Sequence, residues 1–420
     1  MFLGRIATAA LTLGLAACGV PQTEARPAEV QPEPVAAAVP THEAPAASIA
    51  AGQAEFGVNL YRQLGAEPGN VFLSPTSIST ALGMVYAGAE GETAAEMAQA
   101  LRYPAGDVQP GMGALLRQLP IVAEGRVVRI ANALWVQRDF KLRPEYSSVV
   151  KRHYGADASA VDFIGAPDQA IGTVNKWAEE QTAGRIKSLL QRKDITADTR
   201  LILTNSIYFK GDWLKPFGAN STGTRPFLLP GGKSMPATFM RQRNNFRVLR
   251  EEGFEALQAP YKGEELSMIL FVPERPEGLA AFETNLTGEK LNGWINALMK
   301  EQPGDVELVM PKIELTTKAS LVPPLEALGM RRVFTNGAQL GGIAAPAQLR
   351  LSDVIHQTFL LVDEKGTEAA AVTGAIAEIV SMPRQFHADR PFFFLIRDNR
   401  SGTILFMGRI SDPASIGGGA

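Results

Sequence analysis

The longest uninterrupted stretch of this sequence runs from Ala51 to Pro413, without a proline-rich linker or an internal repeat. At roughly 360 residues, it exceeds the size at which chains usually divide into separate domains. We therefore expect one large body in which extended β-sheets span the core. The composition, with 45% hydrophobic and 20% charged residues, is that of a globular protein and excludes a disordered or collagen-like chain.

Local patterns within this stretch indicate both helices and strands. Ser74-Pro75 is typical of a helix N-cap followed by proline at the first helical position, and Ile78, Leu82 and Val85 then recur at helical spacing. Residues rich in β-formers occur at 201–209, 266–272, 392–396 and 403–410. Because helices precede runs of strands without regular alternation, we predict the α+β class.

Charge and cysteine content exclude several classes of site. The 41 basic and 43 acidic residues leave a net charge of -2, which argues against a nucleic-acid-binding surface over the whole protein. Cys18 is the only cysteine, so the chain forms no internal disulfide and no thiolate zinc or iron–sulfur site by itself. We expect no metal, no cofactor and a monomeric protein.

The first residues are typical of an export signal. The apolar run at 6–15 is too short to span a bilayer. The residues that follow it, Leu15-Ala16-Ala17-Cys18, resemble the bacterial lipobox, in which the cysteine thiol receives a diacylglycerol. We predict a lipoprotein signal peptide at 1–17 and lipidation at Cys18. By the same resemblance, Gly19 favours anchorage in the outer membrane of a Gram-negative cell, facing either the periplasm or the cell surface. The alternative is an ordinary secretory signal followed by a chance cysteine.

The segment after the cysteine has the composition of a linker. From Val20 to Ala50 it contains six prolines, abundant alanine and no aromatic residue. Such a segment has too little apolar bulk to offset the entropy of ordering it. We predict a tether across 18–50 and a flexible tail at 414–420.

No catalytic motif stands out. The sequence lacks the G-x-S-x-G elbow, the phosphate-binding glycine loops and the H-E-x-x-H metal motif. Its four histidines, which are scattered singly, are His42, His153, His356 and His387. A serine nucleophile with a distant histidine and aspartate stays open, because such triads assemble in space. We expect that the protein is not an enzyme.

The segment from Val362 to Pro383 has an unusual order of residue types. It begins with charges and glycine, continues with small residues and ends in hydrophobic residues and proline. Every second residue from Thr367 to Ala377 is threonine or alanine, and the intervening positions hold the glutamates and the bulky side chains. Because a strand points successive side chains to opposite faces, this segment could enter a sheet with its small residues inward. The alternative is an alanine-rich loop that never joins a sheet.

The residues EKGTEAAA at 364–371 closely resemble the hinge of the serpins, the serine-protease-inhibitor superfamily. Further motifs that resemble this family follow the same order along the chain, at 70–78, 204–213, 349–356, 389–392 and 404–409. The resemblance covers nearly all of the chain after the tether. It implies a serpin domain at 51–413, with three β-sheets, eight to nine helices and an exposed reactive-centre loop at about 364–390.

The resemblance implies a suicide inhibitor of serine proteases. The protease cuts the loop and forms an acyl-enzyme, and the cleaved loop then inserts into the central sheet, which distorts the protease so that deacylation stalls. The implied hinge residues are Glu364, Gly366, Thr367, Glu368, Ala369, Ala370 and Ala371. No bulky, charged or proline residue occupies the inward positions of the alternation, which favours an inhibitory serpin over a non-inhibitory surface binding protein.

The family's spacing, counted from Glu364, places the scissile bond between Val380 and Ser381. Valine suits the small apolar pocket of elastase-like enzymes, so the expected partner is an elastase-like serine protease in a covalent complex. Cleavage at Ile379 or Met382 is the alternative. Ile379 beside the bond would also suit papain-like cysteine proteases.

Two more groups of residues are implied by the resemblance. Ser74, Ser77, Asn205 and His356 match the shutter, a buried polar cluster where the central sheet opens. Trp213, Lys312 and Glu364 match the breach, where insertion begins, and we expect Lys312 to pair with Glu364. The stretch 112–126 lacks the dense basic helix of heparin-activated relatives, so we expect no glycosaminoglycan cofactor.

Overall fold

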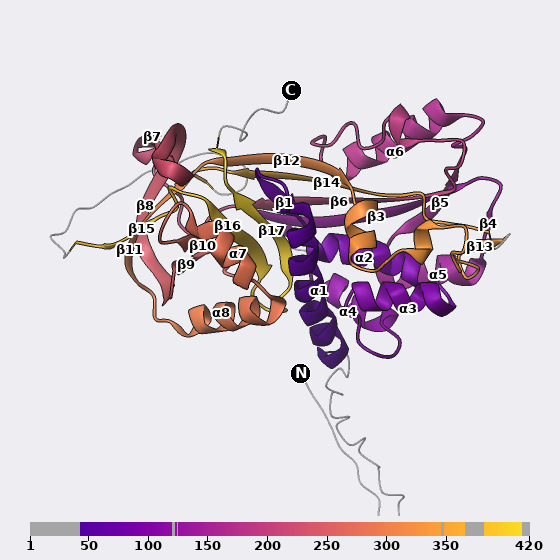
Figure 1. The fold of residues 1–420 in the computed structure, drawn as a ribbon, viewed down its shortest axis with the longest axis horizontal. Coiled ribbons are helices and arrows are strands. Elements are labelled where there is room, and N and C mark those ends of the chain that lie inside the picture. Colours follow the sequence, from indigo (N-terminus) through magenta and orange to yellow (C-terminus); the bar gives the residue numbers. More distant parts are fainter. Residues whose placement is uncertain (1–42, 120–121, 124, 346–347, 366–381, 414–420) are drawn as a thin grey trace, which may run out of the picture. The chain divides into compact units, whose positions relative to one another are not determined.

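The computed structural model describes residues 43–119, 122–123, 125–345, 348–365 and 382–413. Cys18, the signal peptide predicted at 1–17, the first part of the tether and the tail at 414–420 lie outside these residues. Within the described residues the chain forms nine α-helices and three β-sheets, which do not alternate regularly (Figure 1). The predicted α+β class and the predicted numbers of sheets and helices are confirmed.

The first described element, helix α1 (Glu43–Leu64), corrects the predicted extent of the tether. Ala46, Ile49, Ala50 and Ala54 are buried, and their spacing of three and four residues forms one apolar face of a helix. The proline-rich composition predicts a tether up to residue 50. Residues 43–50 contain a single proline, Pro45. It lies in the first helical turn, where proline is tolerated.

A six-stranded sheet spans the upper part of the body in Figure 1. Its strands, in spatial order, are β12 (Ile313–Ser320), β14 (Asp353–Val362), β6 (Leu201–Gly211), β3 (Arg126–Gln137) and β2 (Val122–Ala123), and β5 (Asp157–Val161) pairs with β3. Neighbours in this order are antiparallel except β14 and β6, which run parallel, as do β5 and β3. Helix α6 (Pro167–Gln181) covers one face of this sheet, and α2 (Pro75–Tyr86) packs beneath the other.

A nine-stranded sheet forms the other half of the core. Its order is β1 (Val71–Leu73), β17 (Ile404–Ile410), β16 (Phe392–Asp398), β10 (Leu266–Pro273), β9 (Phe254–Pro260), β8 (Lys233–Glu251), β11 (Gly304–Pro311) and β15 (Arg384–His387), and β7 (Gly223–Leu229) pairs with β8. Every residue of β10 and β17 is buried, as expected for strands covered on both faces. A two-stranded sheet joins β4 (Lys141–Leu142) to β13 (Ala344–Ala345).

The remaining helices complete the layers. They are α3 (Gly91–Ala100), α4 (Gln109–Gln118), α5 (Pro144–Tyr154), α7 (Gly278–Asn285), α8 (Gly288–Lys300) and α9 (Val322–Ala327). At the start of α2, the Ser77 N–H donates to the side chain of Ser74, which confirms the predicted N-cap. The cap fixes Ser74 at the point where α2 meets the six-stranded sheet.

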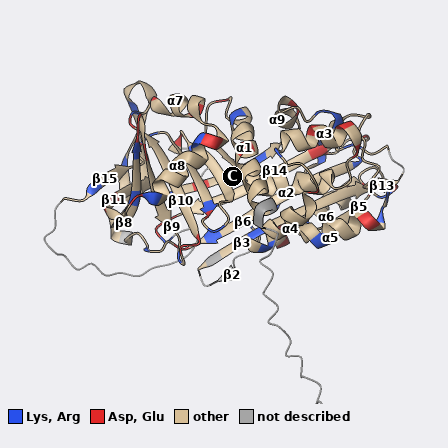
Figure 2. Cartoon of the chain, turned by 90° about the horizontal axis from the view of Figure 1, so that it is seen from below, with Lys and Arg blue, Asp and Glu red and all other residues tan. Residues whose placement is uncertain are grey.

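Basic and acidic residues are interspersed along the ribbon in Figure 2, while the central strands are mostly uncharged. Among the described residues, no helix combines the length and the apolar character needed to cross a membrane.

Candidate functional site

The amino-terminal end of the predicted reactive loop is held by backbone hydrogen bonds. After β14, the carbonyl oxygen of Glu364 accepts from the Phe217 N–H (2.7 Å) and that of Lys365 accepts from the Trp213 N–H (2.7 Å). The Trp213 indole N–H donates to the carbonyl of Asp363 (2.9 Å). The predicted hinge residues Gly366, Thr367, Glu368, Ala369, Ala370 and Ala371 and the predicted bond Val380–Ser381 lie outside the described residues.

The structure brings the three predicted breach residues together at this end of the sheet. Lys312 Nζ lies 2.9 Å from Glu364 Oε2, so the expected pair is present. Thr222 donates its hydroxyl to Glu364 Oε1 (2.8 Å). Burial alone would raise the pKa of Glu364, but the hydrogen bonds from Lys312 and Thr222 hold that pKa below its usual value. Since the Lys312 side chain is 38% exposed, water screens this ion pair, which is worth at most about 1 kcal/mol.

Trp213 is the rigid part of the breach cluster. It is only 2% exposed and stacks on Tyr261, with ring centroids 4.5 Å apart, and Phe217 meets it edge-on at 5.8 Å. Such aromatic pairs add about 0.5–1.5 kcal/mol to the burial of their area. The aromatic stack therefore supplies a fixed donor pair, the Trp213 backbone and indole N–H groups, against which the end of β14 is held.

The structure also brings the four predicted shutter residues together, under the middle of the six-stranded sheet. Asn205 on β6 lies beside His356 on β14 and beside Asn132 on β3, so the three form one row across adjacent strands. All three are buried. Ser74 and Ser77 approach this row from the start of α2.

His356 is neutral because it is buried, and its hydrogen-bond partners fix which ring nitrogen carries the proton. The Ser74 backbone N–H donates to His356 Nε2 (3.3 Å), so the ring proton lies on Nδ1 and is donated to Asn205 Oδ1 (2.7 Å). Burial lowers the pKa of His356 to about 3. The imidazole is therefore uncharged at neutral pH and acts as a bridge between α2 and the sheet.

Asn205 connects the histidine to its other neighbours. Its amide nitrogen donates to the carbonyl oxygen of Ser77 (2.8 Å) and lies within hydrogen-bond reach of Ser77 Oγ and Asn132 Oδ1. The Ser74 hydroxyl donates to the carbonyl of Leu405 on β17. The cluster thus joins three strands of one sheet, a strand of the other and a helix, all through buried polar groups.

Strands β14 and β6 are joined along only part of their length. They pair from Asp353 with Ile202 to Thr358 with Ile207. Past these positions, β14 pairs with β12 as far as Val362, and β6 pairs with β3 as far as Gly211. Within the described residues, the two strands make no backbone pairs with each other over this last part. The shutter row lies in the paired half, and the breach cluster lies at the unpaired end.

The carboxyl-terminal end of the predicted loop is a strand. Met382 is 95% exposed, but Arg384–His387 form β15, which pairs with β11 in parallel, and Phe386 is 1% exposed. The loop predicted at about 364–390 is therefore shorter on this side. Arg384 is also held through Glu255, whose carboxylate accepts from Arg384 (2.8 Å) and Arg250 (2.7 Å).

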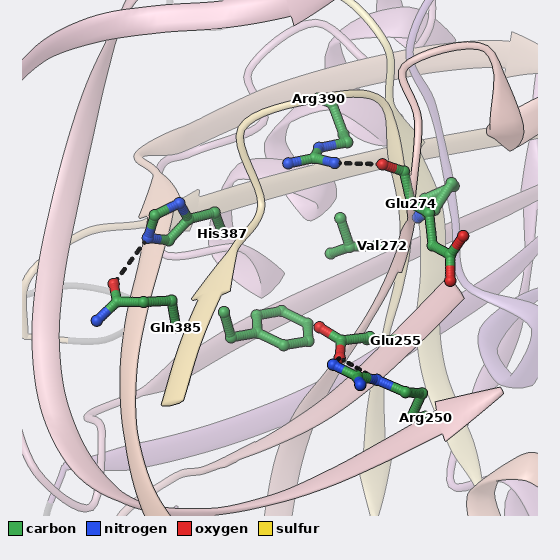
Figure 3. A pocket seen from close by; sticks show the side chains of 9 residues that line it. Arg250, Glu255, Val272, Glu274, Gln385, His387 and Arg390 are labelled. Atoms are coloured by element: carbon green, nitrogen blue, oxygen red, sulfur yellow. Dashed lines mark hydrogen bonds and ion pairs between the residues drawn. The ribbon is translucent and has the colours of Figure 1, made fainter. Parts of the chain in front are cut away.

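A pocket of about 350 Å³ lies beside β15. Figure 3 shows Gln385 and His387 of β15 on one side of it and Glu274 and Arg390 on the other. Arg390 donates to the carbonyl of Glu274, and His387 Nε2 lies 3.0 Å from Gln385 Oε1. These polar contacts hold the segment that follows the loop.

Sequence reasoning missed three residues of these clusters. Asn132 completes the shutter row, Thr222 binds Glu364, and Glu255 holds Arg384. Asn132 could have been found as the lone asparagine in an otherwise β-rich run at 126–137. Thr222 and Glu255 belong to no recognisable sequence motif, and only the three-dimensional contact reveals them.

The described residues contain no group of three or more His, Cys, Asp or Glu side chains that could hold a metal ion. His356 contacts backbone and amide groups. His387 lies 3.9 Å from Asp389 and contacts Gln385. The contacts of both histidines fit roles in holding structure.

Comparisons with known proteins agree on one family. The serpin (serine protease inhibitor) family model matches residues 51–413. The leukocyte elastase inhibitor of Bos taurus is 36% identical, over 87% of this chain and 99% of that protein. A serpin-like protein of Thermococcus kodakarensis is 38% identical, over 85% of this chain and 84% of its own length. The crystal structure of Serpin48 from the insect Tenebrio molitor superposes with a TM-score of 0.77 and 28% identity, covering 87% of this chain and 98% of that one.

The buried neutral His356 predicts that the folded state loses stability in mild acid. Its pKa is about 3 in the folded protein and about 6.5 in an unfolded chain. Between these values the unfolded chain binds the proton, so stability is full above about pH 6.5 and falls as pH is lowered. Lowering the pH from 7.5 to 5 should therefore reduce the free energy of unfolding by about 2 kcal/mol through this one group.

Urea unfolding of the wild type and of His356→Gln at both pH values measures this effect. The loss of stability between pH 7.5 and pH 5 should be smaller by about 2 kcal/mol in the variant. Equal losses in the two proteins would show that burial does not hold His356 neutral in the folded state.

Proposed function

The chain belongs to the serpin family of serine protease inhibitors, and we propose that it traps its target protease irreversibly as an acyl-enzyme. The observation that supports this most directly is the partial pairing of β14 and β6. β14 leads straight to the predicted hinge, and the described residues of the two strands share no backbone pairs over 359–362 and 208–211. A strand could enter the sheet at that end without first breaking a full ladder.

The directions of β14 and β6 determine how an inserted strand would pair with them. A segment that follows β14, turns back and enters between β14 and β6 runs antiparallel to both, because those two strands are parallel to each other. Insertion would replace one parallel contact of six residue pairs by two antiparallel ladders, and antiparallel pairing is slightly more stable per residue. The gain in hydrogen bonds and buried area is the driving force that we propose for the trap.

Insertion also requires the shutter row to open. Neighbouring strands lie about 4.8 Å apart, so a strand between β6 and β14 roughly doubles their separation. The 2.7 Å bond from His356 to Asn205 must then break. Because both side chains are buried, the entering strand must fit a tight space, which is consistent with the small residues at alternate positions of the predicted loop.

In the chemical step that we propose, the serine oxygen of the protease attacks the carbonyl carbon of Val380. The bond from that carbon to the nitrogen of Ser381 then breaks. The new amino group of Ser381 leaves with the proton that the serine hydroxyl of the protease gave up. The ester between the protease serine and Val380 persists because insertion distorts the oxyanion hole. Val380 suggests an elastase-like target, and the bovine relative named leukocyte elastase inhibitor adds loose support.

Two other assignments are alternatives to this proposal. Cleavage at Ile379 or Met382 would point to a protease with a different pocket, and Ile379 beside the bond also suits papain-like cysteine proteases. A non-inhibitory serpin that binds a partner at the cell surface would be cut without trapping the protease. The Lys312–Glu364 pair and the neutral His356 do not distinguish these alternatives, since both belong to the uncut state.

Incubation with pancreatic elastase should give a one-to-one complex that survives SDS, together with a released peptide that begins at Ser381. The inhibitor should be a monomer before the reaction, and trypsin serves as the control protease because Val380 does not suit its pocket. The measurements are gel electrophoresis, mass spectrometry of the peptide and the melting temperature of the cleaved protein. Clean cleavage at every molar ratio, with no rise in melting temperature, would support the non-inhibitory alternative instead.

A pair of loop variants tests which face of the loop enters the sheet. Thr367→Arg places a guanidinium on the proposed inward face, where burial of an unpaired charge costs several kcal/mol, and should convert the inhibitor into a substrate. Glu368→Arg, on the opposite face, is the matched control and should keep the trapping activity. The measured quantity is the number of inhibitor molecules consumed per protease trapped. Equal values for the two variants would contradict the facing assignment.

We also propose that the signal at 1–17 is removed, that Cys18 bears a diacylglycerol and that the protein is anchored in the bacterial outer membrane. The support is the Leu15-Ala16-Ala17-Cys18 sequence and Gly19. Labelling with an alkyne fatty acid should mark the wild type and not Cys18→Ala, which should move to the soluble fraction. An unmodified mature amino terminus by mass spectrometry would refute the anchor and leave the inhibitor proposal intact.

A further inference from the structure

The strand that follows the predicted loop is fixed from its first residue. That residue is Arg384, which pairs with Val306 on β11, and two residues later Phe386 is buried. Ser381, at the predicted bond, comes three residues before Arg384 in the sequence. At about 3.6 Å per residue, the chain between them spans at most about 11 Å. The predicted bond is therefore tied closely to the start of β15.

A side-chain contact adds to this backbone pairing. Arg384 Nη2 lies 2.8 Å from Glu255 Oε1, although the order of the sheet places β8 and β11 between β9 and β15. Glu255, the second residue of β9, also accepts from Arg250 near the end of β8 (2.7 Å). Figure 3 shows Glu255 and Arg250 together at one side of the pocket beside β15. One carboxylate thus joins the start of β15 to two other strands.

The contact between Glu255 and Arg384 is ionic at neutral pH. Burial alone would raise the pKa of Glu255, but the hydrogen bonds from Arg384 and Arg250 hold that pKa below its usual value. Because the side chains of Glu255 and Arg384 are 23% and 38% exposed, water screens the pair, and it adds little to the stability of the whole protein. Its effect is local, since it limits the directions in which 381–383 can leave β15. Pro383 narrows them further through its fixed φ angle.

A held segment after the bond favours the first step of the reaction with a protease. A segment that is already ordered costs the protease less entropy to bind, and attack requires the bond to lie in position at the serine oxygen. With the bond at Val380–Ser381, residues 381–383 are free to occupy the protease cleft. With the bond after Met382, only Pro383 would separate it from the anchored Arg384. The anchor therefore favours Val380, or Ile379 before it, over Met382.

We propose that Glu255 is a positioning residue for the reaction with the protease. By holding Arg384, it presents the segment after the bond in a narrow range of directions and so speeds the attack on Val380. This inference rests on the proposed inhibitory function and adds a determinant of the rate of its first step. The contacts of Glu255 with Arg384 and Arg250 lie apart from the breach and shutter clusters, so it acts on cleavage and not on insertion.

The rate at which pancreatic elastase consumes the intact full chain tests this proposal. Glu255→Gln and Arg384→Gln should each lower the second-order rate constant about fivefold, because the protease must then order 381–383 itself. The double variant should be no slower than either single variant, since both changes remove the same contact. All three variants should melt like the wild type, and the number of inhibitor molecules consumed per protease trapped should stay the same.

Asp305→Asn is the matched control. Asp305 on β11 accepts from Arg243 on β8 (2.7 Å), in a pair whose side chains are also partly exposed. This variant removes the same charge from the same sheet without touching the loop, and it should react at the wild-type rate. A wild-type rate for Glu255→Gln, equal slowing by Asp305→Asn, or multiplied effects in the double variant would overturn the proposal.

The measured rate distinguishes this proposal from the proposed function. Loss of the intact chain counts trapped and merely cut molecules alike, so a protein that is cut without trapping still shows the effect of Glu255. Failure to trap would appear in the stoichiometry and in the absence of a complex that survives SDS. If elastase leaves the wild type intact, the proposed target is wrong, and subtilisin, which accepts many side chains, gives the same comparison. The new amino terminus should be Ser381 or Val380, and Pro383 there would contradict the anchor.

Discussion

Strands β6 and β14 run parallel through the middle of the six-stranded sheet. Several other parts of the structure hold this one contact together. Six residue pairs hold the strands together. The row formed by Asn132, Asn205 and His356 reinforces the contact from below, and α2 is fixed against that row by its N-cap serine. Removal of any one partner would leave buried polar atoms without hydrogen bonds, so the contact tends to be fully closed or fully open.

The two ends of the predicted loop are held with different strength. At the amino-terminal end, the Lys312–Glu364 pair is partly exposed and the backbone bonds to Trp213 and Phe217 involve a short segment. At the carboxyl-terminal end, β15 is part of a sheet and buries Phe386. A cut between the two ends would therefore release the weakly held side, which is continuous with β14, and leave the other side in place.

Much of this arrangement could be predicted from the sequence. The N-cap at Ser74 and the strand around Asn205 follow from local residue patterns, and their assignment to a common cluster with His356 follows from the family resemblance. Asn132, Thr222 and Glu255 could not be assigned in the same way, because their roles depend on register and on contacts between segments distant in the chain. The boundary near residue 50 was wrong for a local reason, since an alanine-rich helix face and an alanine-rich linker have nearly the same composition.

The early start of α1 also changes the length of chain available to a membrane-anchored inhibitor. With Cys18 lipidated as proposed and helix from Glu43 onward, the connecting segment is 18–42, about 25 residues, which reaches at most roughly 80–90 Å when extended. If the proposed anchor is present, the inhibitor would be confined near one membrane surface, where a protease would meet it at a high effective concentration. Under the same proposal, proteases beyond this reach would not be inhibited, so the protein would protect the membrane surface and not the surrounding solution.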